Sequence, residues 1–245
     1  MVATDTRALA AQCLADVALH GASLRERLHP AQARLADPRD RAFLTALVSD
    51  GARWWLRFDE ALDQLLDKPL RKRDPALHAL LVLGLVQLEI LELPPHAAVA
   101  ATVEATRALD RGGFAKLVNA ILRRWLRERD ALNARLDRDA TTRNAHPRWL
   151  IDALRRDWPE RADAILAANN ALAPPMLRVN ARRATRANVV ATLAGIGTET
   201  AGHPFLRDAV TLAANTDVTK LPGFTEGHFS VQDGAAQVAA DLLDL

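Results

Sequence analysis

With 245 residues, of which 49% are hydrophobic and 25% charged, the chain is long enough for one large domain or two ordinary ones, each with a buried core. The net charge of +2 is small, so charge alone does not identify a nucleic-acid-binding protein, and such a role has to rest on clustered basic residues. The single cysteine, Cys13, excludes a disulfide framework within the chain and is typical of a cytoplasmic protein, so we expect cytoplasmic localisation.

The first part, residues 1–130, shows the apolar periodicity of helices and no strand-like alternation. Asp37-Pro38 and Asp74-Pro75 each place a capping aspartate before a proline suited to the first helical position, so helices are predicted to begin there. Gly51 is interpreted as a bend in the first of these helices. The other predicted helices surround residues 9–17 and cover 76–91, 96–109 and 114–129, and the helix at 76–91 is apolar nearly all round, as a central helix is. We therefore predict a helical bundle.

The second part differs in pattern. A charged stretch at 131–145 predicts a linker, and residues 146–245 predict a small α/β subdomain. Its predicted elements are two short helices separated at Pro159, a strand at Met176–Val179, a helix at 185–197, strands within 208–213 and 228–233, and a final helix from Gly234. The predicted fold class is mostly α, with a helical bundle followed by this small α/β subdomain.

Basic residues gather in two places. A loop ahead of Asp74 holds the first cluster, Lys68, Arg71, Lys72 and Arg73, and the last bundle helix holds the second, Lys116, Arg123, Arg124, Arg127 and Arg129. On a helical wheel Lys116, Arg123 and Arg127 share one face, and Arg124 lies just off it. Such a stripe can follow the phosphates of a nucleic acid, although periodicity alone favours an ordinary solvated face.

Two further side chains are candidates for RNA contact. Arg178 and Asn180 alternate outward from the strand at Met176–Val179, where they can contact RNA, another domain or solvent alone. Catalytic residues and a metal site are not predicted, because the seven histidines are scattered and Cys13 falls on an apolar helix face.

Segments of the first part resemble the amino-terminal domain of RsmB-type proteins (also called Sun or Fmu), which are bacterial methyltransferases of 16S, small-subunit ribosomal RNA. The similar segments are residues 37–70, 77–109 and 113–126, and the most specific matches are Pro95–Val99 and Val118–Arg124. That domain is similar to the antitermination factor NusB, an all-helical RNA-binding bundle. Residues 146–180 and 221–237 resemble the segments that follow in the same family.

The resemblance implies a reaction. In the family a catalytic cysteine adds to C6 of the target cytosine, C5 takes a methyl group from S-adenosylmethionine, a base removes the C5 proton, and a second cysteine assists release. The cofactor lies on a Rossmann-like domain with a loop that reads roughly Asp-x-Cys-Ala-Ala-Pro-Gly-Gly-Lys. This sequence lacks that loop, and Cys13 matches neither family cysteine. We therefore expect the Rossmann-like domain to be absent and the chain to be inactive and without bound cofactor.

With the catalytic elements of the family missing, the resemblance implies that this chain serves in RNA recognition. It favours small-subunit ribosomal RNA as the partner of both basic clusters, Arg178 and Asn180. Gln232 and Asp233 match the family's Val-Gln-Asp motif, which implies a place at the edge of the cofactor site of a complete enzyme. The alternative is a free-standing NusB-like factor without enzymatic activity.

The last helix raises a further expectation. Its apolar residues Val238, Leu242, Leu243 and Leu245 are suited to packing against a catalytic domain that follows in the family. We expect this helix to be the least ordered one, or to contact another copy of the chain.

Overall fold

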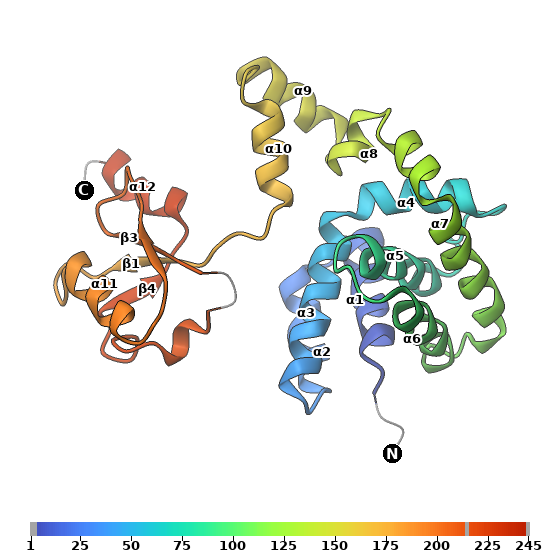
Figure 1. Cartoon of the computed structure of the whole chain (residues 1–245), viewed down its shortest axis with the longest axis horizontal. Coiled ribbons are helices and arrows are strands. Elements are labelled where there is room, and N and C mark those ends of the chain that lie inside the picture. The colour runs from blue at the N-terminus through green and yellow to red at the C-terminus, as the bar shows by residue number, and fades with distance from the viewer. Residues whose placement is uncertain (1–3, 214–215, 244–245) are drawn as a thin grey trace. The chain divides into compact units, whose positions relative to one another are not determined.

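The computed structural model describes residues 4–213 and 216–243. The chain divides into two compact units, Met1–Asn170 and Ala171–Leu245. The first unit is helical, and the second is built on a four-stranded sheet (Figure 1). The helices of the first unit are α1 (Thr6–His20), α2 (Leu24–Ala33), α3 (Pro38–Arg53), α4 (Trp55–Leu65), α5 (Pro75–Glu89), α6 (Pro95–Ala108), the short 3-10 helix η1 (Gly112–Phe114), α7 (Ala115–Leu136), α8 (Ala140–Asn144), α9 (Arg148–Asp157) and α10 (Ala162–Asn170).

The two predicted aspartate caps are confirmed. The Asp37 carboxylate accepts a hydrogen bond from the backbone N–H of Arg39 at 2.8 Å, and the Asp74 carboxylate accepts one from Leu77 at 3.2 Å. Each bond satisfies a donor that the first turn of a helix leaves without a partner. The caps therefore fix the starts of α3 and α5.

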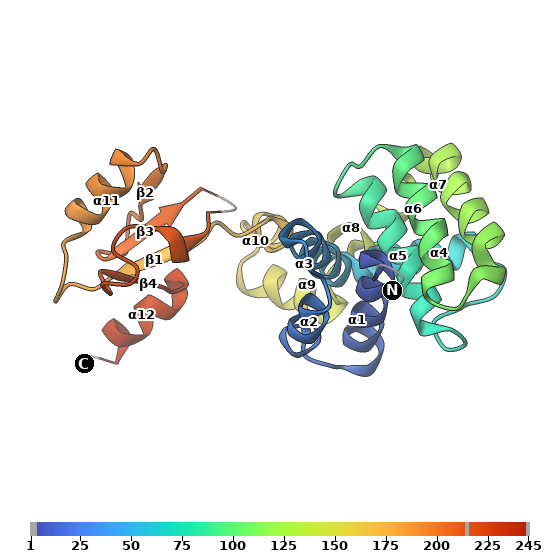
Figure 2. The same cartoon turned by 90° about the horizontal axis from the view of Figure 1, so that it is seen from below.

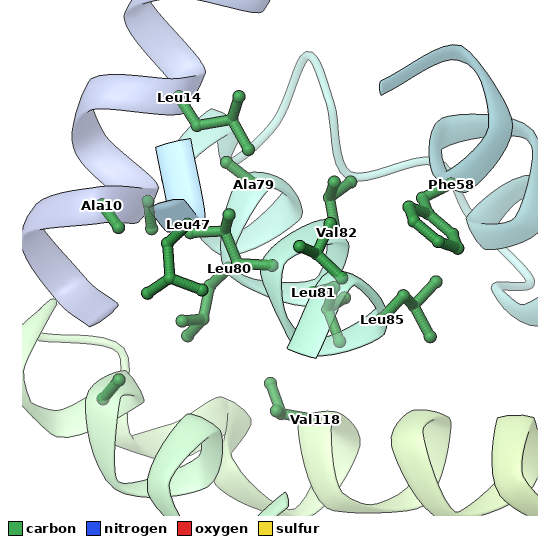
Figure 3. Close-up of a cluster of buried hydrophobic side chains, with 14 of the residues drawn as sticks. Ala10, Leu14, Leu47, Phe58, Ala79, Leu80, Leu81, Val82, Leu85 and Val118 are labelled. Carbon is green, nitrogen blue, oxygen red and sulfur yellow. The ribbon is translucent and has the colours of Figure 1, made fainter. Parts of the chain in front are cut away.

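The central helix of the bundle is α5, as the sequence predicted. Every residue from Leu77 to Leu88 is buried, and α5 contacts α1, α3, α4, α6 and α7. Figure 3 shows its Leu80, Leu81 and Leu85 among side chains from α1, α3, α4 and α7. Burial of one such side chain contributes roughly 1.5–3 kcal/mol, so this cluster is the main source of stability in the unit.

Glycine allows the closest helix contacts in the bundle. A Cβ atom at Gly51 would lie 2.7 Å from Leu14 Cδ2 and 2.8 Å from Leu83 Cδ2. The predicted bend at Gly51 is wrong, because α3 continues to Arg53 and the chain turns at Trp54. Gly51 is instead the point where α1 and α5 approach α3.

The stretch at 131–145, predicted as a linker, contains helical structure. The helix α7 continues to Leu136 because Leu132 and Leu136 are each only 1% exposed. Arg57 of α4 donates to Asn133 Oδ1 at 2.8 Å and to Asp137 Oδ1 at 2.7 Å. These contacts hold the second half of α7 on the bundle, and α8 contacts α4 as well.

The second unit has an antiparallel sheet of strand order β2-β3-β1-β4. Its elements are β1 (Met176–Val179), α11 (Arg186–Gly195), β2 (Thr200–Gly202), β3 (Ala209–Leu212), the 3-10 helix η2 (Val218–Lys220), β4 (Phe229–Val231) and α12 (Gly234–Leu242). The helices α11 and α12 lie on opposite faces of the sheet (Figure 2). Leu177 and Val179 face the α11 side and form a core with Val189, Leu193 and Val210.

The predicted fold class is confirmed, with one strand missed. The strands β1, β3 and β4 lie within their predicted ranges, whereas β2 was not predicted because Thr-Ala-Gly has no apolar alternation. The sheet formed by the described residues is antiparallel, unlike the parallel sheet of a Rossmann-like domain.

The last helix is anchored on one side and exposed on the other. The buried side chain of Gln237 donates to the carbonyl oxygens of Leu177, at 3.3 Å, and Gln232, at 3.0 Å. Leu242 and Leu243 are 80% and 67% exposed. Leu245 lies outside the described residues, and the expectation of low order or of contact with another copy stays a prediction.

Of the helices within residues 4–213 and 216–243, none has the length and apolar character needed to cross a membrane.

Candidate RNA interface

The predicted basic stripe lies on the solvent face of α7. Val118, Leu122 and Trp125 are fully buried on the opposite face, which turns Lys116, Arg123 and Arg127 outward, and all three are exposed. Arg123 Nε donates to Asn119 Oδ1 at 3.0 Å, so a neutral side chain one turn earlier orients this guanidinium. In the described part of the chain none of the three cations forms an ion pair, so their charges are available to an anionic ligand.

Arg124 is separated from this stripe. Its Nε lies 3.2 Å from Glu128 Oε1, and its Nη1 donates to the carbonyl oxygen of Leu65 at 3.4 Å. The carboxylate balances its charge, and the second bond ties α7 to the end of α4. The structure therefore gives Arg124 a connecting role within the bundle.

The loop between α4 and α5, residues 66–74, holds the other basic cluster. Lys68, Lys72 and Arg73 are exposed and form no ion pair with another described residue, whereas Arg71 turns inward to Asp59, at 3.0 Å, and Asp63. Burial by itself lowers the pKa of Arg71, but its hydrogen bond to Asp63 and the nearby acidic charges outweigh burial and raise the pKa. Arg71 is thus a fixed, paired cation that holds the loop on α4.

Both ends of this loop contact the η1–α7 segment. Arg111, just before η1, pairs with the Asp74 carboxylate, and Arg124 bonds the carbonyl oxygen of Leu65. The loop therefore lies beside the first half of α7. Because the loop and α7 are neighbours, we treat the two clusters, about 50 residues apart in sequence, as one candidate surface of the first unit, with Lys68, Lys72, Arg73, Lys116, Arg123 and Arg127 as its cations. We call this surface the α7 basic face.

In the second unit, Arg178 and Asn180 line one hollow of about 490 Å³. Arg178 Nη1 donates to Gln232 Oε1 at 3.3 Å. Asn180 Nδ2 donates to the carbonyl oxygen of Gly227 at 3.1 Å, and its Oδ1 accepts from the backbone N–H of Arg182 at 3.2 Å. Asn180 therefore shapes the turn at the rim of the hollow, while Arg178 presents a positioned guanidinium.

Gln232 and Asp233 make internal hydrogen bonds. Gln232 accepts from Arg178, and Asp233 Oδ1 accepts from the backbone N–H of Ala235 at 2.8 Å, which caps α12. The link between Arg178 and Gln232 was not predicted, because Arg178 lies on β1 and Gln232 follows β4, 54 residues later in the sequence. Their described contacts fit the junction between β4 and α12, and their place at the edge of a cofactor site stays a prediction.

The sole thiol is not suited to nucleophilic attack. Cys13 is buried, and burial together with the charge of Asp16 raises the pKa of its thiol, against the opposing charges of Arg27 and Arg34. A protonated, buried thiol is a weak nucleophile. Among the described side chains, no group of three or more histidine, cysteine, aspartate or glutamate residues could hold a metal ion.

Aromatic side chains divide into core and surface groups. Trp125 is fully buried and its Nε1 donates to Glu89 Oε1 at 2.7 Å, so it is a core residue. Trp149, Trp158 and Phe205 are exposed at 70%, 55% and 89%. The exposure of these three rings was not predicted, because a single aromatic residue in a short helix or loop carries no periodic signal.

Two family models match the chain. The NusB family model matches residues 4–127, and the ferredoxin-like domain of RsmF/B-like methyltransferases matches residues 146–219. A solved structure, that of the protein PH0851, matches with a TM-score of 0.64 over 98% of this chain and 55% of that one, at 15% identity. This last likeness concerns the fold alone.

Several similar curated proteins carry the name ribosomal RNA small subunit methyltransferase B. The relative from Pseudomonas putida is 46% identical over 98% of this chain and 55% of its own length. Those from Xanthomonas campestris and Vibrio cholerae are 45% and 38% identical, over 98% of this chain and 53% and 55% of their own lengths. The chain spans about half the length of the curated relatives it matches. It therefore belongs to the NusB family over its helical part, and by its second matched domain and over nearly its whole length it is similar to proteins named ribosomal RNA small subunit methyltransferase B.

Proposed function

We propose that this chain is the RNA-recognition part of an S-adenosylmethionine-dependent methyltransferase that modifies C5 of a cytosine in 16S, small-subunit ribosomal RNA. The names of its relatives support the substrate class, and the NusB match supports RNA as the ligand. The observation that carries the proposal is the α7 basic face, where exposed lysines and arginines that form no ion pair with a described residue lie on two neighbouring segments.

The geometry of this face suits a phosphate backbone. From Lys116 to Arg127 the stripe extends about 16 Å along the helix, a length that faces several phosphates of a duplex. Contacts of this kind position RNA without reading its sequence. Arg178, held by Gln232 in the second unit, is a further proposed contact, and Asn180 supports the turn beside it.

Chemistry on the base is proposed to need other residues. Attack on a cytosine ring requires the base to leave the stack, so a recognition part has to hold the RNA while the base is delivered to a catalytic site. The cofactor would supply the methyl group. We propose that cofactor binding and transfer need the part of the relatives that this chain does not span, with Gln232 and Asp233 near the edge of that site. Without that part the chain is proposed to be inactive.

The test is charge reversal on α7. The double variant Arg123→Glu/Arg127→Glu removes two cations that have no structural ion pair, and its matched control, Arg25→Glu/Arg39→Glu, makes the same charge change on α2 and α3. With a hairpin of small-subunit ribosomal RNA, we expect the α7 variant to raise the dissociation constant by roughly tenfold and to reduce the slope of log affinity against log salt by about 1.8.

The control decides how a loss is interpreted. If both variants weaken binding equally, general charge accounts for the affinity and the α7 basic face is not the interface. Unchanged affinity of the α7 variant would also reject it. A NusB-like factor without enzymatic partners is less well supported, because the ferredoxin-like match continues to residue 219.

A further inference from the structure

The arginines of the second unit gather on one hollowed surface. Three hollows of about 490, 250 and 450 Å³ adjoin one another, since the first two share Arg178 and the last two share Phe205, and all three share Arg207. Arg182 and Arg186 complete the set, so four of the five arginines in residues 171–245 line this surface. We call it the arginine hollow.

Acidic side chains are sparse in this hollow. Asp208 is the one acidic side chain found among the described residues that line the arginine hollow. Residues 171–245 contain more acidic than basic residues, so the excess of arginine here is a local segregation of charge. Charge of one sign in a concave surface concentrates ligands of the opposite sign, in this case anions.

The arginines differ in how firmly they are held. Arg178 donates to Gln232 Oε1 and Arg186 donates to the carbonyl oxygen of Leu206, each at 3.3 Å. Each neutral acceptor orients one guanidinium without neutralising its charge. Arg207, with a side chain 88% exposed, has a long contact of 3.4 Å to Asp208. The hollow thus combines positioned cations with an accessible one.

An exposed aromatic ring lies at the same place. Phe205 belongs to the loop between β2 and β3, is 89% exposed and lines two of the three hollows. Its backbone N–H donates to His203 Nδ1 at 3.3 Å, and the two rings meet edge to face with centroids 6.0 Å apart. These contacts hold the loop while the phenyl ring stays largely exposed to solvent.

We propose that the arginine hollow binds an unpaired RNA strand, with one base stacked on Phe205 and the adjoining phosphates held by Arg207, Arg182 and Arg178. Aromatic rings stack on bases of any sequence, but only where the face of the base is free, which excludes the interior of a duplex. The inference rests on the proposed function for RNA as the ligand class, and it adds that the second unit takes a single strand.

The experiment uses the 245-residue chain and an unpaired RNA of roughly ten nucleotides without self-complementarity, within the site sizes of small single-strand-binding folds. A blunt duplex of the same length is the comparison ligand. The variants are Phe205→Ala, Phe205→Trp and Arg207→Gln, and both positions are so exposed that the fold is not at risk. The matched controls are Ile196→Ala and Lys220→Gln, two exposed residues of the same unit that do not line the hollow.

Stacking and phosphate binding give different results. Phe205→Ala should weaken single-strand binding by roughly fivefold or more, with an unchanged salt slope, and Phe205→Trp should restore it. Arg207→Gln should reduce the salt slope by about 0.7, the value for one phosphate contact on a single strand. Neither control should change the affinity. Duplex binding should be insensitive to Phe205→Ala.

Three results would overturn the inference: single-strand affinity unchanged in Phe205→Ala and Arg207→Gln, equal losses for duplex and single strand in Phe205→Ala, or losses in the controls of the same size. The result of this experiment is independent of the result of the charge-reversal test on the α7 basic face. If Arg123→Glu/Arg127→Glu leaves hairpin binding intact while the hollow variants lose the single strand, the α7 proposal fails and the arginine hollow remains.

Discussion

At the scale of single residues, the sequence predicted which cations are exposed. It predicted less well which of them are free of ion pairs within the described residues. The helical wheel placed Lys116, Arg123 and Arg127 on the outer face of α7, where they lie. It did not show that Arg71 faces Asp59 and Asp63, because that pairing depends on how the loop returns to α4. Phe205 was missed for a related reason, since its exposure follows from the sheet around it and not from its neighbours in sequence.

The close packing at Gly84 gives a stability prediction at this scale. A Cβ atom there would lie 2.7 Å from Leu122 Cδ2, inside the contact between α5 and α7. Gly84→Ala should gain about 1 kcal/mol of helix propensity but lose about 1–3 kcal/mol to overpacking, so the free energy of unfolding should fall by roughly 1 kcal/mol. Urea unfolding would measure it. Gly113→Ala, where no atom lies within 4 Å of the new Cβ, is the control and should be nearly neutral.

At the scale of elements, the clearest signals came from local chemistry. The Asp-Pro pairs marked the starts of α3 and α5 because capping and proline preference act within one turn. The extension of α7 through 131–136 was not predicted, because the charged composition of this stretch is typical of a linker. The helix is held there by the buried Leu132 and Leu136 and by the hydrogen bonds from Arg57. Contacts that hold elements together are long-range, and the sequence pattern does not contain them.

One such contact is a buried polar bridge between three helices. The side chain of Gln87 in α5, fully buried, accepts from Arg7 Nε of α1 at 2.7 Å and donates to Thr102 Oγ1 of α6 at 3.1 Å. Gln87→Leu removes these partners from Arg7 and Thr102, and an unsatisfied buried polar group costs about 1–3 kcal/mol. We expect a loss of that size in the free energy of unfolding.

A double-mutant cycle separates the bridge from simple repacking. If the hydrogen bond carries the effect, Gln87→Leu and Arg7→Met should be coupled by at least about 0.5 kcal/mol. Arg25→Met, at an exposed arginine of α2, is the matched control and should add to Gln87→Leu without coupling. Equal coupling in both cycles would mean that the bridge has no specific role.

At the scale of the whole molecule, each unit has its own core, and each presents a separate candidate RNA surface. The bundle was predictable because helical periodicity persists over many residues. The second unit was predictable in class but not in detail, since its strands have only three or four residues and its hollow is assembled from strand, helix and loop residues that are far apart in sequence. Residue patterns alone did not indicate that the two units serve one function. The family resemblance suggested that both take part in RNA recognition.

The burial of the single thiol bears on the activity of this chain. A methyl transfer that begins with cysteine attack on C6 of cytosine needs a reactive thiolate, and Cys13 is the one cysteine in the sequence. Burial raises the pKa of Cys13, so little thiolate is present at neutral pH, and its Sγ lies 3.6 Å from the carbonyl oxygen of Arg27 inside the bundle. We therefore expect this chain to bind small-subunit ribosomal RNA and to transfer no methyl group from labelled S-adenosylmethionine, while the longer relative from Pseudomonas putida, as positive control, incorporates label. Incorporation by this chain that Cys13→Ser abolishes would contradict the assignment of recognition alone, because a buried, protonated thiol would then have served as the nucleophile.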